Sequence, residues 1–441
     1  MNTKIRAAYD TSLFGACYIN YQSRTGIFRA VEEVLLELSR RNNISVRSVA
    51  LNHESTIWDE VSNQLYFEKE RPELLASFSE IHYSRLRLKA MYIQLINLQR
   101  KLVSSTDSKK DLRYKAGRAL EILGSRLAKK EASIFCDSSE YDIYHVSYFP
   151  LPDANVLPKV PRILTVYDLI PLLFPEFFVP RVNQRAADII KSIDVKKDWI
   201  ICISEHTKRD FCQYTGMDSA RVFVTPLAAA SYFYPVEDPS YINQVLDRCN
   251  IPRSPYVLSL CTIEPRKNIE LLIHAFSDLV ELHPATELNL VLVGVNGWKN
   301  KPIFEAVQNN PLVRDRIFFT GYLPDEDLAP IYSGALMFVY PSLYEGFGLP
   351  PLEAMQCGTP VIASNTSSLP EVVGEAGILI DPTNKDELHH AMWELMNDKQ
   401  LRKELSQRAI ARASQFTWEK SVDKTIEVYK MAVDSKKLST L

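Results

Sequence analysis

The sequence has no paired cysteines, no long apolar run and no excess of charge of one sign. Its seven cysteines are scattered and none stands in a CxxC pair, so neither a zinc site nor a disulfide framework is expected. No stretch approaches the roughly 20 apolar residues of a membrane-spanning helix, and the first residues lack the apolar core of a signal peptide. The formal net charge of −3 gives no global field for capturing nucleic acid. These absences predict a cytoplasmic protein with reduced thiols and no nucleic-acid partner.

The length and the strand pattern predict two α/β domains. A chain of 441 residues is too long for one ordinary hydrophobic core. Short β-branched or aromatic runs alternate with amphipathic stretches from about residue 140 onwards, as in βαβ units around parallel sheets. The expected strands are DIYHV, RILTVYDL and DWIICIS in the first half, and YVLSLC, LNLVLVG, RIFFTG, ALMFVYP and TPVIAS in the second. Two doubly wound, Rossmann-like sheets fit this rhythm, and the cleft between them would be the natural active site.

The boundary between the two domains is expected near residues 228–255. This stretch contains several prolines and no strand pattern, which is typical of a linker. It separates an N-terminal domain at 1–235 from a C-terminal domain at 250–420.

A basic helical segment at residues 84–130 interrupts the alternation in the N-terminal half. It contains 13 lysines and arginines against 3 aspartates and glutamates, an excess of 13 − 3 = 10. One interpretation is an inserted helical hairpin with a solvated face. The other is a surface for an anionic membrane or an anionic lipid-linked acceptor.

The most informative stretch is VYPSLYEGFGLPPLEAMQCGTPVIAS. A strand ends at Pro341, a glycine-bearing loop follows, and Pro350 stands where a helix would begin. Backbone amides at the positive end of that helix make a site for a diphosphate. Glu345 precedes the loop and Glu353 lies in the following helix, so two carboxylates could accept sugar hydroxyls. The amides expected to bind the diphosphate are those of Gly346, Phe347, Gly348 and Leu349.

A second cluster, LCTIEPRKNIELLIHAF, places Arg266 and Lys267 at the turn between a strand and a helix. Cations oppose the helix dipole at that end, so their position favours a functional role over a structural one. Two cations there can neutralise the charge that develops on a departing nucleoside diphosphate.

The stretch EGFGLPPLE resembles the E-x7-E motif of the large retaining glycosyltransferase family 4. Its members have the GT-B fold, in which two Rossmann-like domains face each other across a cleft. The resemblance spans most of the chain and includes the EPRKN signature. Many relatives also have a glycine and sometimes a second arginine near Cys261, and this chain lacks both. It implies that Glu345 contacts the donor sugar, that Glu353 contacts the ribose, and that both cations bind the diphosphate. In RIFFTGYLPDEDLAPIY it implies base recognition by Gly321 and Leu323.

The same RIFFTGYLPDEDLAPIY stretch contains Asp325-Glu326-Asp327, formally a DxD motif. Such a motif binds Mn or Mg in metal-dependent transferases of the other major fold. Here it precedes an expected helix, where acidic residues favourably cap the dipole. No metal or other cofactor is therefore expected.

The N-terminal half carries weaker parts of the resemblance. SRTGIFRAVEEVLLEL resembles the glycine turn and first helix that face the diphosphate, which makes Gly26 and Arg29 acceptor-side candidates. YDIYHVSYFPLP adds His145 and Tyr148, although a packed strand-end histidine is the alternative for His145. ICISEHTKRDF, from Ser204, also matches. In TVYDL a tyrosine, Tyr167, replaces the histidine of many members, so positioning of the sugar or acceptor is expected of it and Asp168 rather than general base catalysis.

The overall pattern is most similar to the bacterial mannosyl- and rhamnosyltransferase-like branch that builds surface polysaccharides. This resemblance implies retaining transfer of mannose or a related hexose from a nucleotide-diphosphate donor to a glycan or lipid-linked glycan, in the cytoplasm or at the inner face of the membrane. It also implies that the tail at 421–441 is a closing helix. A non-catalytic nucleotide-sugar-binding partner remains an alternative. A hydrolysing nucleotide-sugar epimerase of the same fold is disfavoured, because such enzymes generally lack the two motifs.

Overall fold

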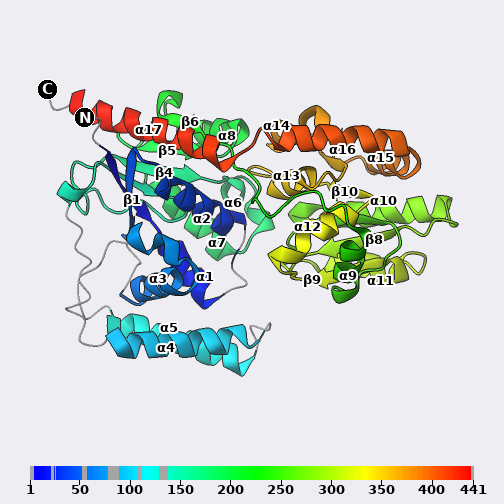
Figure 1. The fold of residues 1–441 in the computed structure, drawn as a ribbon, viewed down its shortest axis with the longest axis horizontal. Helices are drawn as coiled ribbons and strands as arrows, with labels where there is room; N and C mark the ends of the chain where they lie inside the picture. The colour runs from blue at the N-terminus through cyan, green and yellow to red at the C-terminus, as the bar shows by residue number, and fades with distance from the viewer. Residues whose placement is uncertain are drawn as a thin grey trace.

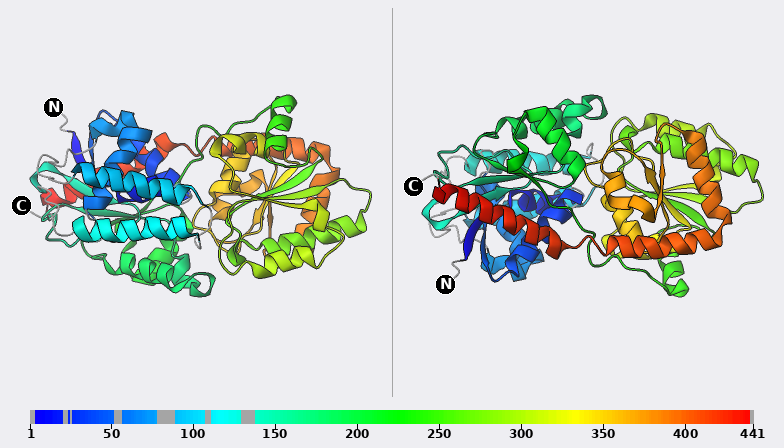
Figure 2. Two further views of the ribbon diagram at one scale, coloured as in Figure 1. Left: turned by 90° about the horizontal axis from the view of Figure 1, so that it is seen from below. Right: turned by 90° about the horizontal axis from the view of Figure 1, so that it is seen from above.

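The computed structural model describes residues 4–20, 24, 26–51, 57–77, 89–106, 111–128 and 138–438. Two domains lie side by side, each built on a six-stranded parallel sheet with helices on both faces (Figures 1 and 2). The predicted α/β fold of two Rossmann-like domains is confirmed.

The N-terminal sheet has the strand order β2-β1-β3-β4-β5-β6. Strands β3 and β5 of this sheet are buried along their whole length, because helices cover both faces of a parallel sheet. One apolar core joins the sheet to α1, α2, α3 and α17, and a second lies on the other face beneath α8. The strands are β1 (Ile5–Asp10), β2 (Ile44–Val49), β3 (Ile143–Val146), β4 (Arg162–Val166), β5 (Trp199–Cys202) and β6 (Val222–Val224). The helices of this domain are α1 (Ser12–Ile19), α2 (Gly26–Ser39), α3 (Ile57–Glu70), α4 (Lys89–Ser104), α5 (Leu112–Ala128), α6 (Ile170–Leu173), α7 (Pro180–Lys191) and α8 (Glu205–Thr215).

The C-terminal sheet has the order β12-β11-β10-β7-β8-β9. Read from the other edge, this is the 3-2-1-4-5-6 order of a dinucleotide-binding sheet, whose ligand site lies where the winding direction reverses. That reversal falls between β7 and β10. The strands are β7 (Tyr256–Leu260), β8 (Asn289–Val293), β9 (Ile317–Gly321), β10 (Met337–Tyr340), β11 (Val361–Ser364) and β12 (Ile378–Ile380). The helices are α9 (Pro239–Arg248), α10 (Ile269–Leu282), α11 (Lys301–Gln308), α12 (Asp325–Gly334), α13 (Leu349–Gln356), α14 (Leu369–Val373), α15 (Lys385–Asn397) and α16 (Lys399–Ala413).

The chain passes between the domains twice. The first passage lies between β6 and α9, and α9 packs against α12 of the C-terminal domain. Part of the predicted linker is therefore a helix of the second domain. The second passage follows α16, after which α17 (Trp418–Leu438) returns along the N-terminal domain and contacts α2, β3 and β5 (Figure 1).

The described part of the basic segment is a pair of antiparallel helices, α4 and α5. This hairpin forms an outer layer that packs on α1 and α3 (Figures 1 and 2). Residues 84–88, 107–110 and 129–130 of the predicted segment lie outside the described residues. No helix within the described ranges is long and apolar enough to cross a bilayer.

Candidate active site

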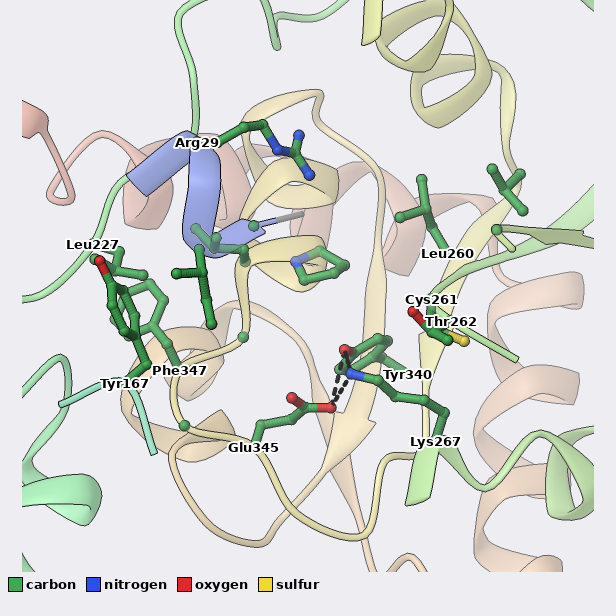
Figure 3. Close-up of a pocket in the computed structure, with 18 of the residues that line it drawn as sticks. Arg29, Tyr167, Leu227, Leu260, Cys261, Thr262, Lys267, Tyr340, Glu345 and Phe347 are labelled. Carbon is green, nitrogen blue, oxygen red and sulfur yellow. Dashed lines mark hydrogen bonds and ion pairs between the residues drawn. The ribbon is translucent and has the colours of Figure 1, made fainter. Parts of the chain in front are cut away.

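A cavity of about 370 Å³ lies between the two domains (Figure 3). It opens at the β7–β10 reversal of the C-terminal sheet and is closed on the other side by α2 and the loop after β4. Most of the predicted site residues line it together: Gly26, Arg29, Tyr167, Asp168, Arg266, Lys267, Leu323, Glu345, Gly346, Phe347, Gly348 and Leu349.

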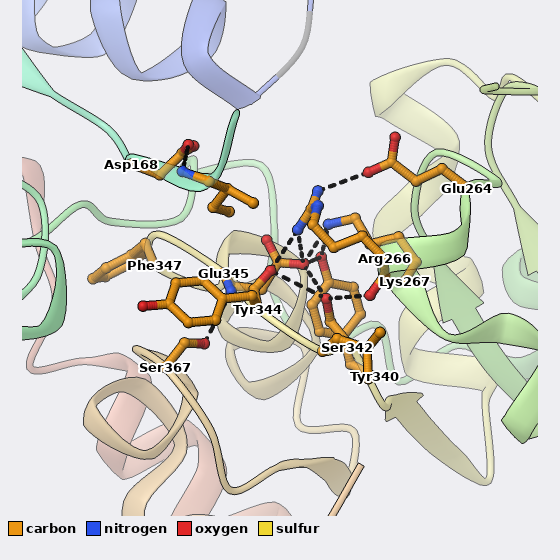
Figure 4. A network of polar contacts seen from close by, with 12 residues as sticks. Asp168, Glu264, Arg266, Lys267, Tyr340, Ser342, Tyr344, Glu345, Phe347 and Ser367 are labelled. Carbon is orange, nitrogen blue, oxygen red and sulfur yellow. Dashed lines mark hydrogen bonds and ion pairs between the residues drawn. The ribbon is translucent and has the colours of Figure 1, made fainter. Parts of the chain in front are cut away.

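Four donors converge on one oxygen of Glu345 at the floor of this cavity (Figure 4). Its Oε1 accepts from Lys267 Nζ at 2.5 Å and lies 2.9 Å from Arg266 Nη1. The hydroxyls of Tyr340 and Ser342 donate to the same oxygen at 3.0 and 2.6 Å. The two motifs that the sequence separates by about 80 residues thus form a single buried ion cluster.

The charged groups of this cluster stabilise one another in their ionised forms. Burial alone would raise the pKa of Glu345, but Arg266 and Lys267 outweigh that effect and lower the pKa to about 2. Arg266 is 9% exposed, and it also donates to Glu264 at 2.8 Å and to the carbonyl oxygen of Tyr344 at 2.6 Å. Its Nε has no hydrogen-bond partner among the described residues. A buried, unpaired donor beside an open cavity is suited to an anionic ligand oxygen.

The local backbone places both cations at the end of β7. Residues Pro265–Lys267 form a short 3₁₀ turn that ends at Asn268, whose φ of 56° is left-handed. The Asn268 side chain stabilises this turn by donating to the carbonyl oxygens of Pro341 and Pro382 at 3.1 and 2.8 Å. The turn therefore directs Arg266 and Lys267 toward β10 and Glu345.

The glycine loop touches the opposite domain directly. A Cβ on Gly346 would stand 2.2 Å from the backbone oxygen of Tyr167, so only glycine fits this contact. The carbonyl oxygen of Gly346 accepts from Ser204 Oγ at 2.8 Å and from Thr207 Oγ1 at 3.1 Å. Gly348 has a φ of 122° and turns the chain into α13, whose first turn faces the cavity. The loop therefore places its amides at the N-terminus of α13, where backbone donors suit an anionic group.

Glu353 lies behind the cavity wall and is 2% exposed. Its two oxygens contact Arg29 Nη1 of α2 at 3.2 Å and the Tyr332 hydroxyl at 3.0 Å. Burial raises the pKa of Glu353, and Arg29 only partly offsets that rise. The expected ribose ligand is thus paired with an acceptor-side cation across the domain interface.

Of the two residues expected to recognise the base, Leu323 lines the cavity, while Gly321 lies just beyond its lining and has a φ of 74°. Asp325 lines the cavity and accepts from the Tyr232 hydroxyl at 2.9 Å. Asp327 points elsewhere and pairs with Arg248. The DxD carboxylates therefore do not face a common point, and the described residues contain no group of three or more metal-ligating side chains.

Tyr167 and Asp168 form the N-terminal wall opposite the cluster (Figures 3 and 4). Burial raises the pKa of Tyr167 well above its usual value, so its hydroxyl is a hydrogen-bond donor at neutral pH. Burial also raises the pKa of Asp168, and Arg266 counteracts that rise. Asp168 Oδ1 accepts from the amide of Ile170 at 2.9 Å, which fixes the carboxylate at the start of α6.

Two of the acceptor-side candidates lie outside this cavity. His145 is 2% exposed and bridges the Tyr429 hydroxyl of α17 and Thr165 Oγ1 at 2.7 and 2.8 Å. Burial lowers its pKa to about 3, so it is a neutral packed histidine of the sheet. Tyr148 lines a neighbouring cavity instead.

Several residues of the site were not singled out by sequence reasoning. Tyr340 and Ser342 complete the Glu345 cluster, and both stand inside the quoted VYPSLYEGFG stretch at the end of a strand. Glu371 receives the amides of Glu205 and His206 at 2.8 and 2.7 Å, which caps α8 across the domain interface. No local pattern could reveal this last contact, because it joins residues about 165 positions apart.

A doubly wound domain pair with cations, a carboxylate and a glycine loop at the switch point defines a GT-B glycosyltransferase. The chain belongs to the glycosyltransferase group 1 family: the model of that family, described as "Glycosyl transferases group 1", matches residues 249–412.

Named relatives agree with this membership, and a solved structure has a similar fold. O-antigen chain mannosyltransferase B of Escherichia coli is 34% identical over 305 residues, which cover 69% of this chain and 77% of that protein. The serotype-specific mannosyltransferase WbdA of Escherichia coli is 35% identical over 301 residues, and this chain spans only 36% of its length. Sucrose-phosphate synthase from Thermosynechococcus elongatus has a similar fold, with a TM-score of 0.60, 20% identity and coverage of 98% of this chain and 100% of that chain.

Proposed function

We propose that the protein transfers mannose or a related hexose, with retention, from a nucleotide-diphosphate sugar to a glycan or lipid-linked glycan. The observation that carries this proposal is the buried cluster of Arg266, Lys267 and Glu345 beside the glycine loop. The mannosyltransferase relatives support the choice of sugar and of a surface-glycan acceptor.

The chemistry follows from where the charges lie. The diphosphate rests on the amides of the loop, with its developing negative charge next to Arg266 and Lys267. As the bond between C1 and the phosphate oxygen breaks, the acceptor hydroxyl attacks C1 from the same face. Its proton passes to the departing phosphate oxygen, so no protein nucleophile is required. Tyr167 donates a hydrogen bond that positions the sugar or the acceptor. We propose transfer without a metal, since the two cations supply the positive charge.

The test is donor turnover with GDP-mannose, UDP-glucose and dTDP-rhamnose against a panel of glycan acceptors. A product with the donor's anomeric configuration, formed in the presence of EDTA, is expected. An inverted product would contradict the retaining mechanism, and loss of turnover with EDTA would contradict the metal-free mechanism.

We further propose that the enzyme works in the cytoplasm and docks on the inner face of an anionic membrane through the α4–α5 hairpin. The hairpin exposes apolar side chains beside its cations: Leu112 is 80% exposed and Leu123 is 54% exposed. On α5, Lys115 and Arg126 lie among them. An apolar face flanked by cations is the pattern of an interfacial helix.

Flotation with phosphatidylserine-containing vesicles tests this docking. The exposed cations contribute about 1 kcal/mol each near an anionic surface, so Lys115→Gln with Arg126→Gln should weaken binding by about tenfold or more. The matched control is Lys424→Gln with Lys430→Gln on α17, which should bind as the unaltered protein does. Absence of flotation at low salt would show that the hairpin is only a solvated layer.

A further inference from the structure

Helix α7 carries an apolar stripe that the described residues bury only in part. Val182, Ala186, Ile189 and Ile190 recur at helical spacing on one face. None of the residues of α7 is fully buried, although the stripe does not face open solvent either. These side chains line an enclosed space instead.

That space is a second cavity of about 240 Å³ beneath α6 and α7. Leu164, Val166 and Leu172 add further apolar wall. The cavity adjoins the candidate active site, because both spaces are lined by Ile27, Tyr167, Asp168 and Arg266. An occupant of the second cavity would therefore lie next to the point where the sugar is transferred.

Away from Tyr167, Asp168 and Arg266, which this cavity shares with the active-site cavity, two hydroxyls of the wall are already hydrogen-bonded. Ser147 Oγ bonds the Tyr9 hydroxyl at 3.0 Å, and Thr165 Oγ1 bonds His145 at 2.8 Å. At the rim, the Arg185 guanidinium stacks over the ring of Tyr148 at 4.2 Å. A sugar inserted here would bury hydroxyls with few available partners, which is unfavourable. An apolar group would gain stability in proportion to its buried area.

We propose that this second cavity binds an apolar group that the acceptor carries within about one sugar of its reacting hydroxyl. The group is either an alkyl or prenyl aglycone or an apolar substituent on the acceptor ring. This inference rests on the proposed function, since it assigns the acceptor of that reaction. It predicts that the enzyme acts on the apolar end of an acceptor rather than far along a polar glycan.

Calorimetry with the full chain and UDP or GDP present tests the assignment, using methyl α-mannoside and hexyl α-mannoside as probes. Each buried methylene should tighten binding by about fourfold, so the hexyl probe should bind at least about tenfold tighter than the methyl probe. Methyl 2-O-methyl-α-mannoside separates the two sources: tighter binding of this probe alone assigns a ring substituent, and tighter binding of the hexyl probe assigns an aglycone.

Ala186→Phe fills the cavity from α7 and should bring the probes to equal affinity. Gln184→Phe, on the exposed face of the same helix, should leave the preference unchanged. If Ala186→Phe does not fold, Ala186→Val narrows the same wall and should reduce the preference. Equal binding of all three probes by the unaltered protein, or a preference that persists in a folded cavity-filling variant, would overturn the proposal.

Donor turnover measured on the same samples separates this inference from the proposed function. Turnover without any apolar preference contradicts only the second cavity's role. An apolar preference without turnover contradicts the transferase proposal and leaves the cavity assignment standing.

Discussion

The two walls of the cleft are built from different chemistry. The C-terminal wall consists of charges that fix one another, with Lys267, Arg266 and two hydroxyls on a single oxygen of Glu345. The N-terminal wall consists of Gly26, Ile27 and the Tyr167 ring beside two cations, Arg24 and Arg29, and the Asp168 carboxylate, and these charges do not meet at one atom.

On the proposed function, the two walls would have different roles. The ionic wall would stabilise the charge that appears on a leaving diphosphate, because it needs no rearrangement during the reaction. The N-terminal wall would select the acceptor. Changes in the first wall should therefore reduce rate, and changes in the second should alter substrate choice or stability.

The largest expected effect comes from removing a cation of the C-terminal wall. Arg266→Ala and Lys267→Ala should each lower kcat/KM, because a contact to the leaving group is lost in the transition state. The activation free energy should rise by about 2–4 kcal/mol. Steady-state transfer assays on folded protein measure this loss. Arg253→Ala, a surface arginine of the same domain, is the control and should be neutral. Unaltered turnover in either cluster variant would remove the cluster from the mechanism.

The second prediction concerns the stability of the N-terminal sheet. The pKa of His145 is about 3 in the folded state and near 6.5 when unfolded, so the unfolded chain binds the extra proton between these values. The unfolding free energy should therefore fall as the pH is lowered, by about 2.5 kcal/mol from about pH 6 to about pH 4. Urea unfolding of the unaltered protein and of His145→Gln should show this difference in pH dependence. Parallel curves would mean that His145 is charged in the fold.

The third prediction tests the ion pair between Arg29 and Glu353, which joins the two domains. Glu353→Gln should weaken nucleoside-diphosphate binding by about 2 kcal/mol, because a charged acceptor for the ribose hydroxyls is lost. Calorimetry measures the affinity, with Glu326→Gln on the exposed start of α12 as the matched control. An unchanged affinity would assign Glu353 to holding Arg29 alone.

The smallest effect is expected at Tyr167 of the N-terminal wall. Tyr167→Phe removes one neutral hydrogen bond and should reduce transfer by about tenfold, or ~1.4 kcal/mol, with donor binding intact. Tyr234→Phe, an exposed tyrosine, is the control. A loss of several thousandfold in transfer rate would make Tyr167 a proton-transfer residue. Both walls would then take part in the chemical step.

The ionic wall could be predicted closely because its residues stand in two short motifs at strand ends. Parallel strands deliver such ends to one edge of a sheet, so EPRKN and EGFG meet whatever lies between them. The strands β1, β2, β6 and β12 were not predicted, since they are short or carry charged residues, such as Arg6 in β1 and Arg47 in β2.

The N-terminal wall was harder to predict because its features depend on packing between distant segments. His145 stands at a strand end, as an active-site histidine would, and only the return of α17 with Tyr429 shows that it is enclosed. Likewise, the apolar stripe of α7 has the sequence of an ordinary core-facing helix. Periodicity states which face is apolar, and it does not state whether protein or a cavity lies against that face.

Because α17 returns to the N-terminal domain, two chain segments connect the domains rather than one. Two connections favour rotation of one domain about the line that joins them and restrict its rotation in other directions. Any opening of the cleft about these two connections would separate the Gly346 loop from Tyr167, which are in contact in this structure. Deleting residues from about 418 onwards would leave one connection. The relative orientation of the two walls would then be less restricted, while the side chains of each wall would be unchanged.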